Sequence, residues 1–343
     1  MEHFAGLDVS LEATTVCVVD ACGVVVREGT CASEPEALAG WLGAAGVALS
    51  LVGLEAGPLS GWLWSGLRAA GLPAVCLETR RLRGMTAALP VKTDRTDARA
   101  IAQAMRCGLY RAVHVKSAAS QELRLLLSSR QQLLRLRVDL DNGVRGSLKA
   151  FGLKVGRVGA SGFADRVLEL LQGRPSLAGV VRPLLAARAE LARQFAVLDA
   201  ELRRLVRQHG TCRRLMTVPG VGPVASLAYV TALDDPSRFR RSREVGAYLG
   251  LTPRRYQSGE VDRLGRVSKA GDLLAREALF LAAHTLLTRV KRPSALRLWG
   301  LAVAKRRGLR RATVAVARRL AVLLHRIWRD GTTFRWPTPQ PAA

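Results

Sequence analysis

The sequence predicts a mixed α/β domain over residues 1–115, a helical connector over 116–208 and a mainly α-helical C-terminal domain over 209–332. Three observations lead to this prediction: short β-rich runs alternating with helices come first, leucines spaced by seven follow, and apolar helical stretches broken by Gly- and Arg-rich turns come last. The 343 residues are enough for such domains and for a substantial core.

The first domain is predicted from runs typical of strands and helices. Three strands joined by short polar connections come first, followed by helices that alternate with buried strands. This order describes a ribonuclease H-like fold. The expected strands cover residues 4–9, 15–19, 24–30, 50–55 and 74–78, and the expected helices cover 34–42, 59–70 and 93–107.

The connector is predicted to contain two long helices. Leu126, Leu133 and Leu140 are spaced by seven, and after a Gly-containing break at 151–162 the same spacing returns from Leu184 to Leu205. This periodicity suits coiled-coil or bundle packing. Pairing within one chain and dimerisation are both compatible with it.

The C-terminal domain begins with a turn of the sequence PGVGP before an apolar helix. It resembles the turn of a helix-hairpin-helix, in which the backbone N–H groups of Gly220 and Gly222 could hold a phosphate. A plain turn between helices is an equal alternative. Beyond it we expect a loop, then a final helix over 313–328 and a flexible tail over 333–343. The loop's basic residues, expected to contact nucleic acid, are Arg254, Arg255, Arg263, Arg266 and Lys269.

The formal charge of +26 is unevenly distributed. The net charge is zero over residues 1–116, +8 over 117–210 and +18 over 211–343. Part of the arginine excess fits a compositional bias of the source genome, but bias does not explain its concentration in the last third. The charge therefore favours a nucleic acid as partner over a membrane surface or an acidic protein.

Other features exclude several classes of protein. A hydrophobic content of 49% excludes a disordered chain, and the sequence has neither a membrane-length apolar run nor a basic-then-apolar signal pattern at its N-terminus. The six scattered cysteines are expected to be free thiols of a cytoplasmic protein. His284 and His325 lie in apolar helical stretches, where we expect hydrogen-bonded core histidines.

Four acidic residues form the candidate catalytic and metal-binding set. Asp8 and Glu55 end apolar runs that read as strands, while Asp94 and Asp97 open a predicted helix and share one of its faces. Carboxylates held close together repel one another unless a cation lies between them, and Mg²⁺ prefers such oxygen ligands. Two Mg²⁺ ions about 4 Å apart would support phosphodiester chemistry. Glu78 also ends a strand and is a weaker candidate.

Several motifs in order resemble the transposases of the insertion sequence 110 family. They are GLDVS, GLEAG, KTDRTDARAIA, VPGVGPVASLAYV, YLGLTPRRYQSG, GRVSKAGDLLAREAL and LRRATVAVARRLAVLLHRIWRDG, spread over residues 4–330. The resemblance implies a RuvC-like domain whose DEDD acids fall on Asp8, Glu55, Asp94 and Asp97. It also implies a helical connector and a C-terminal transposase domain.

The resemblance further implies that Ser258, in the motif QSG, is a covalent nucleophile, with Ser268 as the nearby alternative. A phosphoserine link would conserve the bond energy needed to rejoin strands. The hydroxyl would need help from the metal site or an acid of the first domain to lose its proton, and Arg254, Arg255 and Arg266 are expected around it.

The implied partners are double-stranded DNA, a structured guide RNA encoded by the element, and further copies of the chain in dimers that pair into tetramers. Two alternatives stay open at this point. One is a RuvC-like structure-specific nuclease that uses metal-activated water and needs no serine. The other is a nucleic-acid-binding protein that has lost catalysis.

Overall fold

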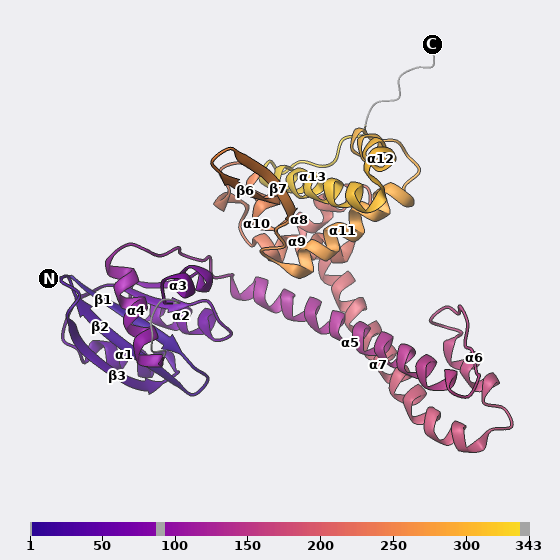
Figure 1. Cartoon of the computed structure of the whole chain (residues 1–343), viewed down its shortest axis with the longest axis horizontal. Coiled ribbons are helices and arrows are strands. Elements are labelled where there is room, and N and C mark those ends of the chain that lie inside the picture. Colours follow the sequence, from indigo (N-terminus) through magenta and orange to yellow (C-terminus); the bar gives the residue numbers. More distant parts are fainter. Residues whose placement is uncertain (1, 87–92, 337–343) are drawn as a thin grey trace, which may run out of the picture. The chain divides into compact units, whose positions relative to one another are not determined.

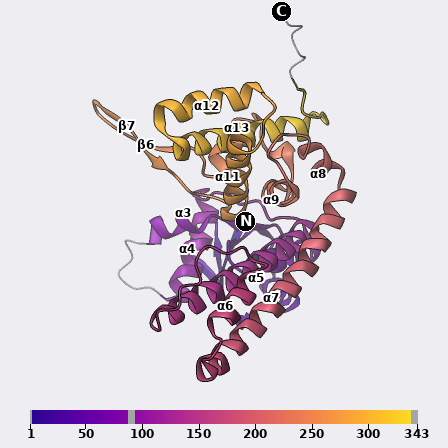
Figure 2. The same cartoon turned by 90° about the vertical axis from the view of Figure 1, so that its right-hand side faces the viewer.

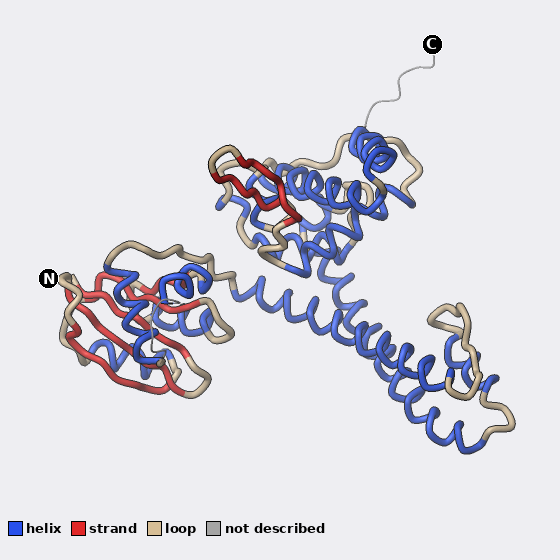
Figure 3. The backbone as a smooth tube through the Cα atoms, in the orientation of Figure 1, coloured by secondary structure: helices blue, strands red, loops and turns tan. Residues whose placement is uncertain are grey.

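The computed structural model describes residues 2–86 and 93–336 (Figure 1). The chain divides into two compact units, Met1–Lys116 and Ser117–Ala343. Strands form a sheet in the first unit and one hairpin in the second, whereas helices make up most of the second (Figure 3). The predicted succession of a mixed α/β region and a helical region is confirmed.

A five-stranded sheet forms the centre of the first unit. Its spatial order is β3-β2-β1-β4-β5, in which β1 runs antiparallel to β2 and parallel to β4. The two outer strand pairs are β2 with β3, which is antiparallel, and β4 with β5, which is parallel. The strands are β1 (His3–Val9), β2 (Ala13–Asp20), β3 (Val25–Ala32), β4 (Leu49–Glu55) and β5 (Ala74–Leu77), close to the predicted runs.

Helices cover both faces of this sheet. On one face, α1 (Pro35–Gly43) and α2 (Ser60–Ala69) bury leucines against alternate residues of β1, β2 and β4. On the other, α4 (Asp94–Arg106) buries a stripe of alanines together with Ile101 and Met105. A further helix, α3 (Thr79–Thr86), was not predicted, because its sequence TRRLRGMT is short and mostly polar.

Helix α4 lies unusually close to the sheet because two facing strand residues are glycines. A Cβ atom at Gly6 would lie 2.2 Å from the Ala98 carbonyl oxygen, and one at Gly53 would lie 2.8 Å from the Met105 side chain. Gly6 and Gly53 are partners in the parallel register of β1 and β4. A bulkier residue at Gly6 would therefore push the helix away, whereas one at Gly53 would first displace the Met105 side chain.

Two long helices begin the second unit. Helix α5 (Ala118–Lys149) pairs with α7 (Pro175–Gln208), joined by a loop and the short α6 (Phe163–Leu170). Ion pairs link them, from Arg130 to Asp199 at 2.6 Å and from Arg188 to Asp141. The two helices thus pair within one chain, although Leu133 and Leu140 stay half-buried and Leu184 is exposed.

The rest of the second unit is a helical domain around the apolar helix α9. Every residue of α9 from Ala225 to Leu233 is buried, and the Tyr229 hydroxyl donates a hydrogen bond to the Ala321 carbonyl oxygen at 2.6 Å. The helical elements of this domain are α8 (Gly210–Leu215), α9 itself (Pro223–Leu233), the 3-10 turn η1 (Pro236–Arg238), α10 (Glu244–Tyr248), α11 (Leu273–Thr288), α12 (Ala295–Arg307) and α13 (Leu309–Arg329).

The structure also bears on the predictions for His325, for the C-terminal tail and for membrane spans. His325 is fully buried and hydrogen-bonded, as predicted. At the predicted flexible tail, the Phe334 amide donates to Thr217 and the Arg292 guanidinium lies over the Trp336 ring, while residues 337–343 lie outside the described part of the chain. Among the described residues, no helix combines the length and apolarity that a membrane span requires.

We predict that Gly6→Ala destabilises the first unit by about 2–3 kcal/mol, because its Cβ meets the backbone of α4 rather than a movable side chain. Gly40→Ala is the matched control: it lies inside α1 with open space around it, and we expect a gain of about 0.5–1 kcal/mol there. Hydrogen–deuterium exchange of the full chain, followed in peptides of β1, measures both. Equal protection in the two variants would contradict the close-packing argument.

Candidate functional site

Asp8 and Glu55 lie side by side on neighbouring strands. Leu7 of β1 is paired with Leu54 of β4 in a parallel register, so the next residue on each strand carries a carboxylate. Since side chains alternate along a strand, Asp8 points to the same face as Gly6, the face covered by α4. The two acids line a common pocket of about 200 Å³.

Asp94 and Asp97 occupy the first turn of α4, which Thr93 caps. They precede Ala98 and Ile101, which face the sheet, by four residues each, so they continue the same helical stripe. The far end of α4 lies near the β2–β3 turn, where Gln103 donates to the Gly23 carbonyl oxygen at 2.8 Å. The first turn of α4 therefore lies toward the end of the sheet that carries the other two acids.

The described part of the chain contains no group of three or more His, Cys, Asp or Glu side chains close enough to hold one metal ion. The structure thus brings Asp8 and Glu55 together, but Asp94 and Asp97 do not line their pocket. In chemical type the four candidate side chains still suit a hard cation, because all of them are carboxylates. Acidic side chains in the first turn also stabilise a helix, because they lie at the positive end of its dipole. This gives a second explanation for the presence of Asp94 and Asp97.

An ion-pair cluster holds α4 against the edge of the sheet. Glu28 on β3 accepts hydrogen bonds from Arg99 and from Arg95, at 2.7 Å and 2.6 Å respectively, and its side chain is only 7% exposed. The hydrogen bond from Arg99, with help from Arg95, lowers the pKa of Glu28 to about 2. Because Arg95 lies between Asp94 and Asp97 in the sequence, this cluster fixes the turn that bears both acids.

The expected catalytic loop around Ser258 is instead a β-hairpin. Strand β6 (Pro253–Ser258) pairs antiparallel with β7 (Val261–Val267), and Ser258 is the last residue before the Gly259–Glu260 connection. The loop prediction was wrong because Gly and Ser were taken as loop residues, although Gly at the first position of a two-residue connection is typical of a hairpin. The hairpin extends away from the helices of its domain (Figure 2), and Ser258 is exposed.

Hydrogen bonds fix the base of this hairpin in the helical domain. The amides of Ser268 and Lys269 donate to the carbonyl oxygens of Thr252 and Gly250 at 2.9 Å and 3.1 Å. One guanidinium nitrogen of Arg276 lies within hydrogen-bonding distance of four carbonyl oxygens between Leu249 and Asp272. The tip thus projects from a base with many hydrogen bonds.

The arginines of the hairpin are not all placed around the serine as expected. Arg255 lies on the face opposite Ser258 and forms an ion pair with Asp262 at 2.6 Å, which lowers the pKa of Asp262. Arg254 shares the face of Ser258 and donates to the Ser268 carbonyl oxygen at 3.4 Å. Arg263, opposite Tyr256, lies over its ring at 5.4 Å.

The two turn glycines before α9 differ in their surroundings. Gly220 has a φ of +88°, and a Cβ there would lie 2.5 Å from the Ala282 carbonyl oxygen of α11, so close packing alone requires glycine. Gly222 is the N-cap of α9 and has open space around it. Of the two, only Gly222 has room beside it for a ligand.

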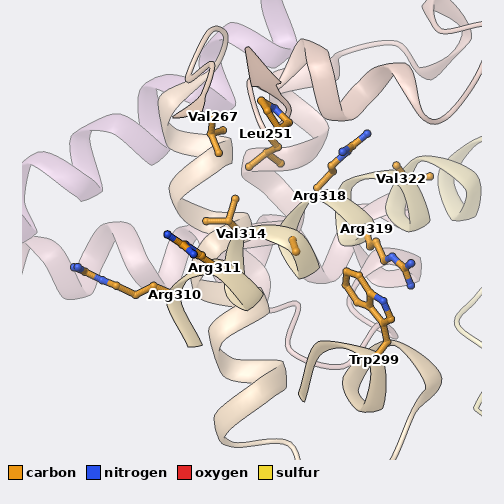
Figure 4. Close-up of a pocket in the computed structure, with 11 residues that line it drawn as sticks. Leu251, Val267, Trp299, Arg310, Arg311, Val314, Arg318, Arg319 and Val322 are labelled. Carbon is orange, nitrogen blue, oxygen red and sulfur yellow. The ribbon is translucent and has the colours of Figure 1, made fainter. Parts of the chain in front are cut away.

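A groove of about 780 Å³ lies between the base of the hairpin, α12 and α13 (Figure 4). Its floor is apolar, with Leu251, Val267 and Val314, and the Arg319 guanidinium lies 3.5 Å above the Trp299 ring. Its four arginines are Arg310, Arg311, Arg318 and Arg319. A basic groove with an apolar floor suits contact with a nucleic-acid strand.

Two features of the structure were not predicted from the sequence: the Glu28 ion-pair cluster and the groove lined by arginines of α13. The Glu28 cluster left a signal, since Arg95 and Arg99 are four apart, but their partner on β3 is distant in sequence. The groove has a signal in the sequence as well. The pairs Arg310–Arg311 and Arg318–Arg319 are eight residues apart, which is about two helical turns, so they can line one side of a helix. Neither signal identifies the partner without the fold.

Comparisons with known proteins agree with this architecture. Residues 5–152 match a family described as "Transposase", of the DEDD type of insertion sequence 110, and residues 212–299 match the "Transposase IS116/IS110/IS902 family". The chain is 32% identical over 250 residues to the "Transposase for insertion sequence element IS1111A" of Coxiella burnetii, covering 71% of this chain and 68% of that one.

Two further relatives show similar coverage. A "Probable family 20 transposase" of Pseudomonas aeruginosa is 32% identical over 256 residues, which is 71% of this chain and 74% of that one. The "Transposase for insertion sequence element IS1328" of Yersinia enterocolitica is 28% identical over 245 residues, or 71% and 73%. The alignments thus span about two thirds to three quarters of the relatives' lengths.

We predict that the Glu28 cluster stabilises the first unit only at pH above its folded pKa. Because the folded pKa of about 2 is below the ordinary 4.5, this stability is complete above about pH 5 and is lost as the pH falls toward 2. Glu28→Gln should therefore unfold at a lower temperature than wild type at pH 7, with the difference shrinking below pH 4. Thermal melts between pH 3 and 7 test this, and a difference independent of pH would contradict it.

Proposed function

The chain belongs to the IS116/IS110/IS902 family of transposases, enzymes that act on DNA, and from this premise we propose how its residues divide the work. The family resemblance seen in the sequence motifs is confirmed. We propose a Mg²⁺-dependent recombinase that cleaves and rejoins DNA strands through a phosphoserine intermediate, guided by a structured RNA from the element. The observation that carries the proposal is the pocket shared by Asp8 and Glu55, beside the helix that bears Asp94 and Asp97.

The first unit is proposed to be a ribonuclease H-like domain of the RuvC type. In support, its three antiparallel strands precede two parallel ones, and the parallel strands lie on the other side of β1 from β2. In support too, the ends of β1 and β4 are neighbours in the sheet, and the acid at each end has the strand position that faces the helix-covered side. Residues 116–208 would be the connector and 209–332 the transposase domain.

The four acids would hold Mg²⁺ and orient the phosphate to be cleaved. Bound there, the cation would neutralise charge on the phosphate and on the leaving oxygen. Asp8 and Glu55 supply two carboxylates that line one pocket, and carboxylate oxygens are the ligands that Mg²⁺ prefers. Helix α4 would bring the carboxylates of Asp94 and Asp97 to the same phosphate.

Ser258 would attack the phosphorus atom. Its oxygen forms a bond to phosphorus, the bond from phosphorus to one sugar oxygen breaks, and that sugar oxygen leaves with a proton as a hydroxyl group. The reverse attack by a sugar hydroxyl releases the serine and rejoins a strand without ATP. The exposed place of Ser258 at the hairpin tip suits approach to a DNA backbone, and a carboxylate of the first unit would accept the serine proton.

The site would be composite, because the acids and Ser258 belong to separate compact units. The two could come from one chain or from two copies, in the dimers and tetramers that the family suggests. Arg254, Arg263, Arg266 and Lys269 on and beside the hairpin would contact the nucleic-acid backbone, as would the amide of Gly222 at the start of α9.

We predict that Asp8→Asn, Glu55→Gln, Asp94→Asn and Asp97→Asn each lower strand cleavage about a thousandfold or more, since each removes a negative charge from the metal site. DNA binding should change little. Glu78→Gln is the matched control, because Glu78 follows the neighbouring strand β5 and pairs with Arg111 at 3.6 Å instead. Cleavage assays across a Mg²⁺ titration measure the effect. Full cleavage by Asp8→Asn, or an equal loss in Glu78→Gln, would rule out the assignment.

We predict that Ser258→Ala yields no covalent protein–DNA adduct, whereas Ser268→Ala, at the hairpin base, still forms one. Denaturing gels with labelled DNA reveal the adduct as a band of reduced mobility. If Ser258→Ala cleaves DNA to free ends at the wild-type rate, the enzyme is a nuclease that uses water. An adduct in Ser258→Ala would show that another residue is the nucleophile.

A further inference from the structure

A second basic pocket lies at the opposite end of α13 from the start of the groove. Its volume is about 380 Å³, and one buried serine, Ser242, lines it together with five arginines. The arginines come from two walls: the segment before α10 and the last turns of α13. They are Arg240, Arg241, Arg243, Arg326 and Arg329, and all five are exposed.

The segment before α10 is held firmly against α13. The Ser242 hydroxyl lies 2.9 Å from Nδ1 of His325, and Nε2 of His325 lies 3.0 Å from the Pro236 carbonyl oxygen. Because a carbonyl oxygen only accepts, Nε2 carries the proton of the ring. The ring also packs edge-on against Phe239 at 5.6 Å. The arginine pocket therefore has a built wall rather than a loose loop.

Carboxylates neutralise little of this positive charge. Arg329 pairs with Asp330 at 2.8 Å, and Glu244 accepts a hydrogen bond from the Arg241 amide at 3.5 Å. Among the described residues, no ion pair involves Arg240, Arg243 or Arg326. Guanidinium groups gathered around one hollow repel one another, so an anion between them would relieve a standing electrostatic cost.

The pocket continues a basic stripe along α13. Arg311, Arg318 and Arg329 are seven and eleven residues apart, spacings that return to nearly the same face of a helix. Along α13, Arg326 and Arg329 lie on average 13 residues beyond the groove's four arginines, a rise of about 20 Å. One rigid helix thus presents two separate sites for negative charge, and a ligand that reaches both must be a polyanion.

We propose that this pocket binds backbone phosphate of a nucleic acid, through bidentate hydrogen bonds from its guanidinium groups. Arginine suits this task because its planar fork matches two phosphate oxygens, which a lysine ammonium cannot do. Phosphate of duplex DNA and phosphate of a structured RNA share this chemistry. The inference rests on the proposed function only in that the chain binds a nucleic acid; it needs no cleavage.

The test compares Arg243→Lys/Arg326→Lys, one residue from each wall, with Arg306→Lys/Arg307→Lys at the end of α12. Both variants keep the net charge, and both change two exposed arginines. Fluorescence anisotropy of the full chain measures the Kd for a 30-base-pair DNA duplex and for an RNA hairpin of equal length. We expect the pocket variant to bind about tenfold more weakly to the nucleic acid that fills the pocket, and the control to bind as wild type.

Weaker binding in the DNA arm, the RNA arm or both identifies the source of the phosphate. Wild-type affinity of the pocket variant in both arms, or an equal loss in the control, would overturn the proposal. The corresponding alanine variants give a second reading: the pocket variant should lower the slope of log K against log salt by about 0.9 for each phosphate that the arginines no longer neutralise. If the double variant does not fold, the single variant Arg240→Lys, at an exposed residue of the pocket, is measured in the same assay.

The outcome is distinguishable from failure of the proposed function. If no strand cleavage is found, the two binding arms still decide whether the pocket holds phosphate. If the pocket variants bind as wild type, the effects of Asp8→Asn and Ser258→Ala on cleavage still decide the chemistry.

Discussion

The close contact between α4 and the glycines of β1 and β4 is the constraint on which the candidate metal site depends. With a side chain at Gly6, the helix would be displaced outward together with its first turn, and one at Gly53 would disturb the Met105 packing beneath it. Because the strands are parallel at this point, Asp8 and Glu55 follow these glycines in step. The strand register therefore sets where Asp8 and Glu55 lie, and the packing contact sets how near to them the first turn of α4 lies.

The charged residues of the chain are also distributed differently between its first unit and its C-terminal domain. The first unit is neutral overall, and its charges are used locally, as in the Glu28 cluster that holds α4. The C-terminal domain carries an excess of arginine, much of it on the hairpin and on α13, and few of those arginines are paired with carboxylates. A neutral site for chemistry and a basic surface for binding suit an enzyme whose substrate is a polyanion.

Features that depend on a local sequence pattern were predicted well from the sequence. The strands of the first unit, the start of α4 with its Thr93 cap, and the long helices of the connector all carry a strong period or a capping residue. The hairpin was missed because charged and small residues such as Arg254 and Gly259 hide its alternation, and because both its faces are exposed. The pairing of Arg255 with Asp262 depends on that register, and the arginine pocket depends on contact between segments some 85 residues apart. No local pattern encodes either.

The central claim is that the carboxylates at the ends of β1 and β4 and in the first turn of α4 hold a divalent cation. Anomalous diffraction from crystals of the full chain grown with Mn²⁺, which can replace Mg²⁺ at oxygen ligands, tests it most directly. The account predicts an anomalous peak between Asp8 and Glu55, with at least one aspartate of α4 completing the coordination. A peak elsewhere, or a metal bound by Asp8 and Glu55 while α4 stays out of reach, would contradict it.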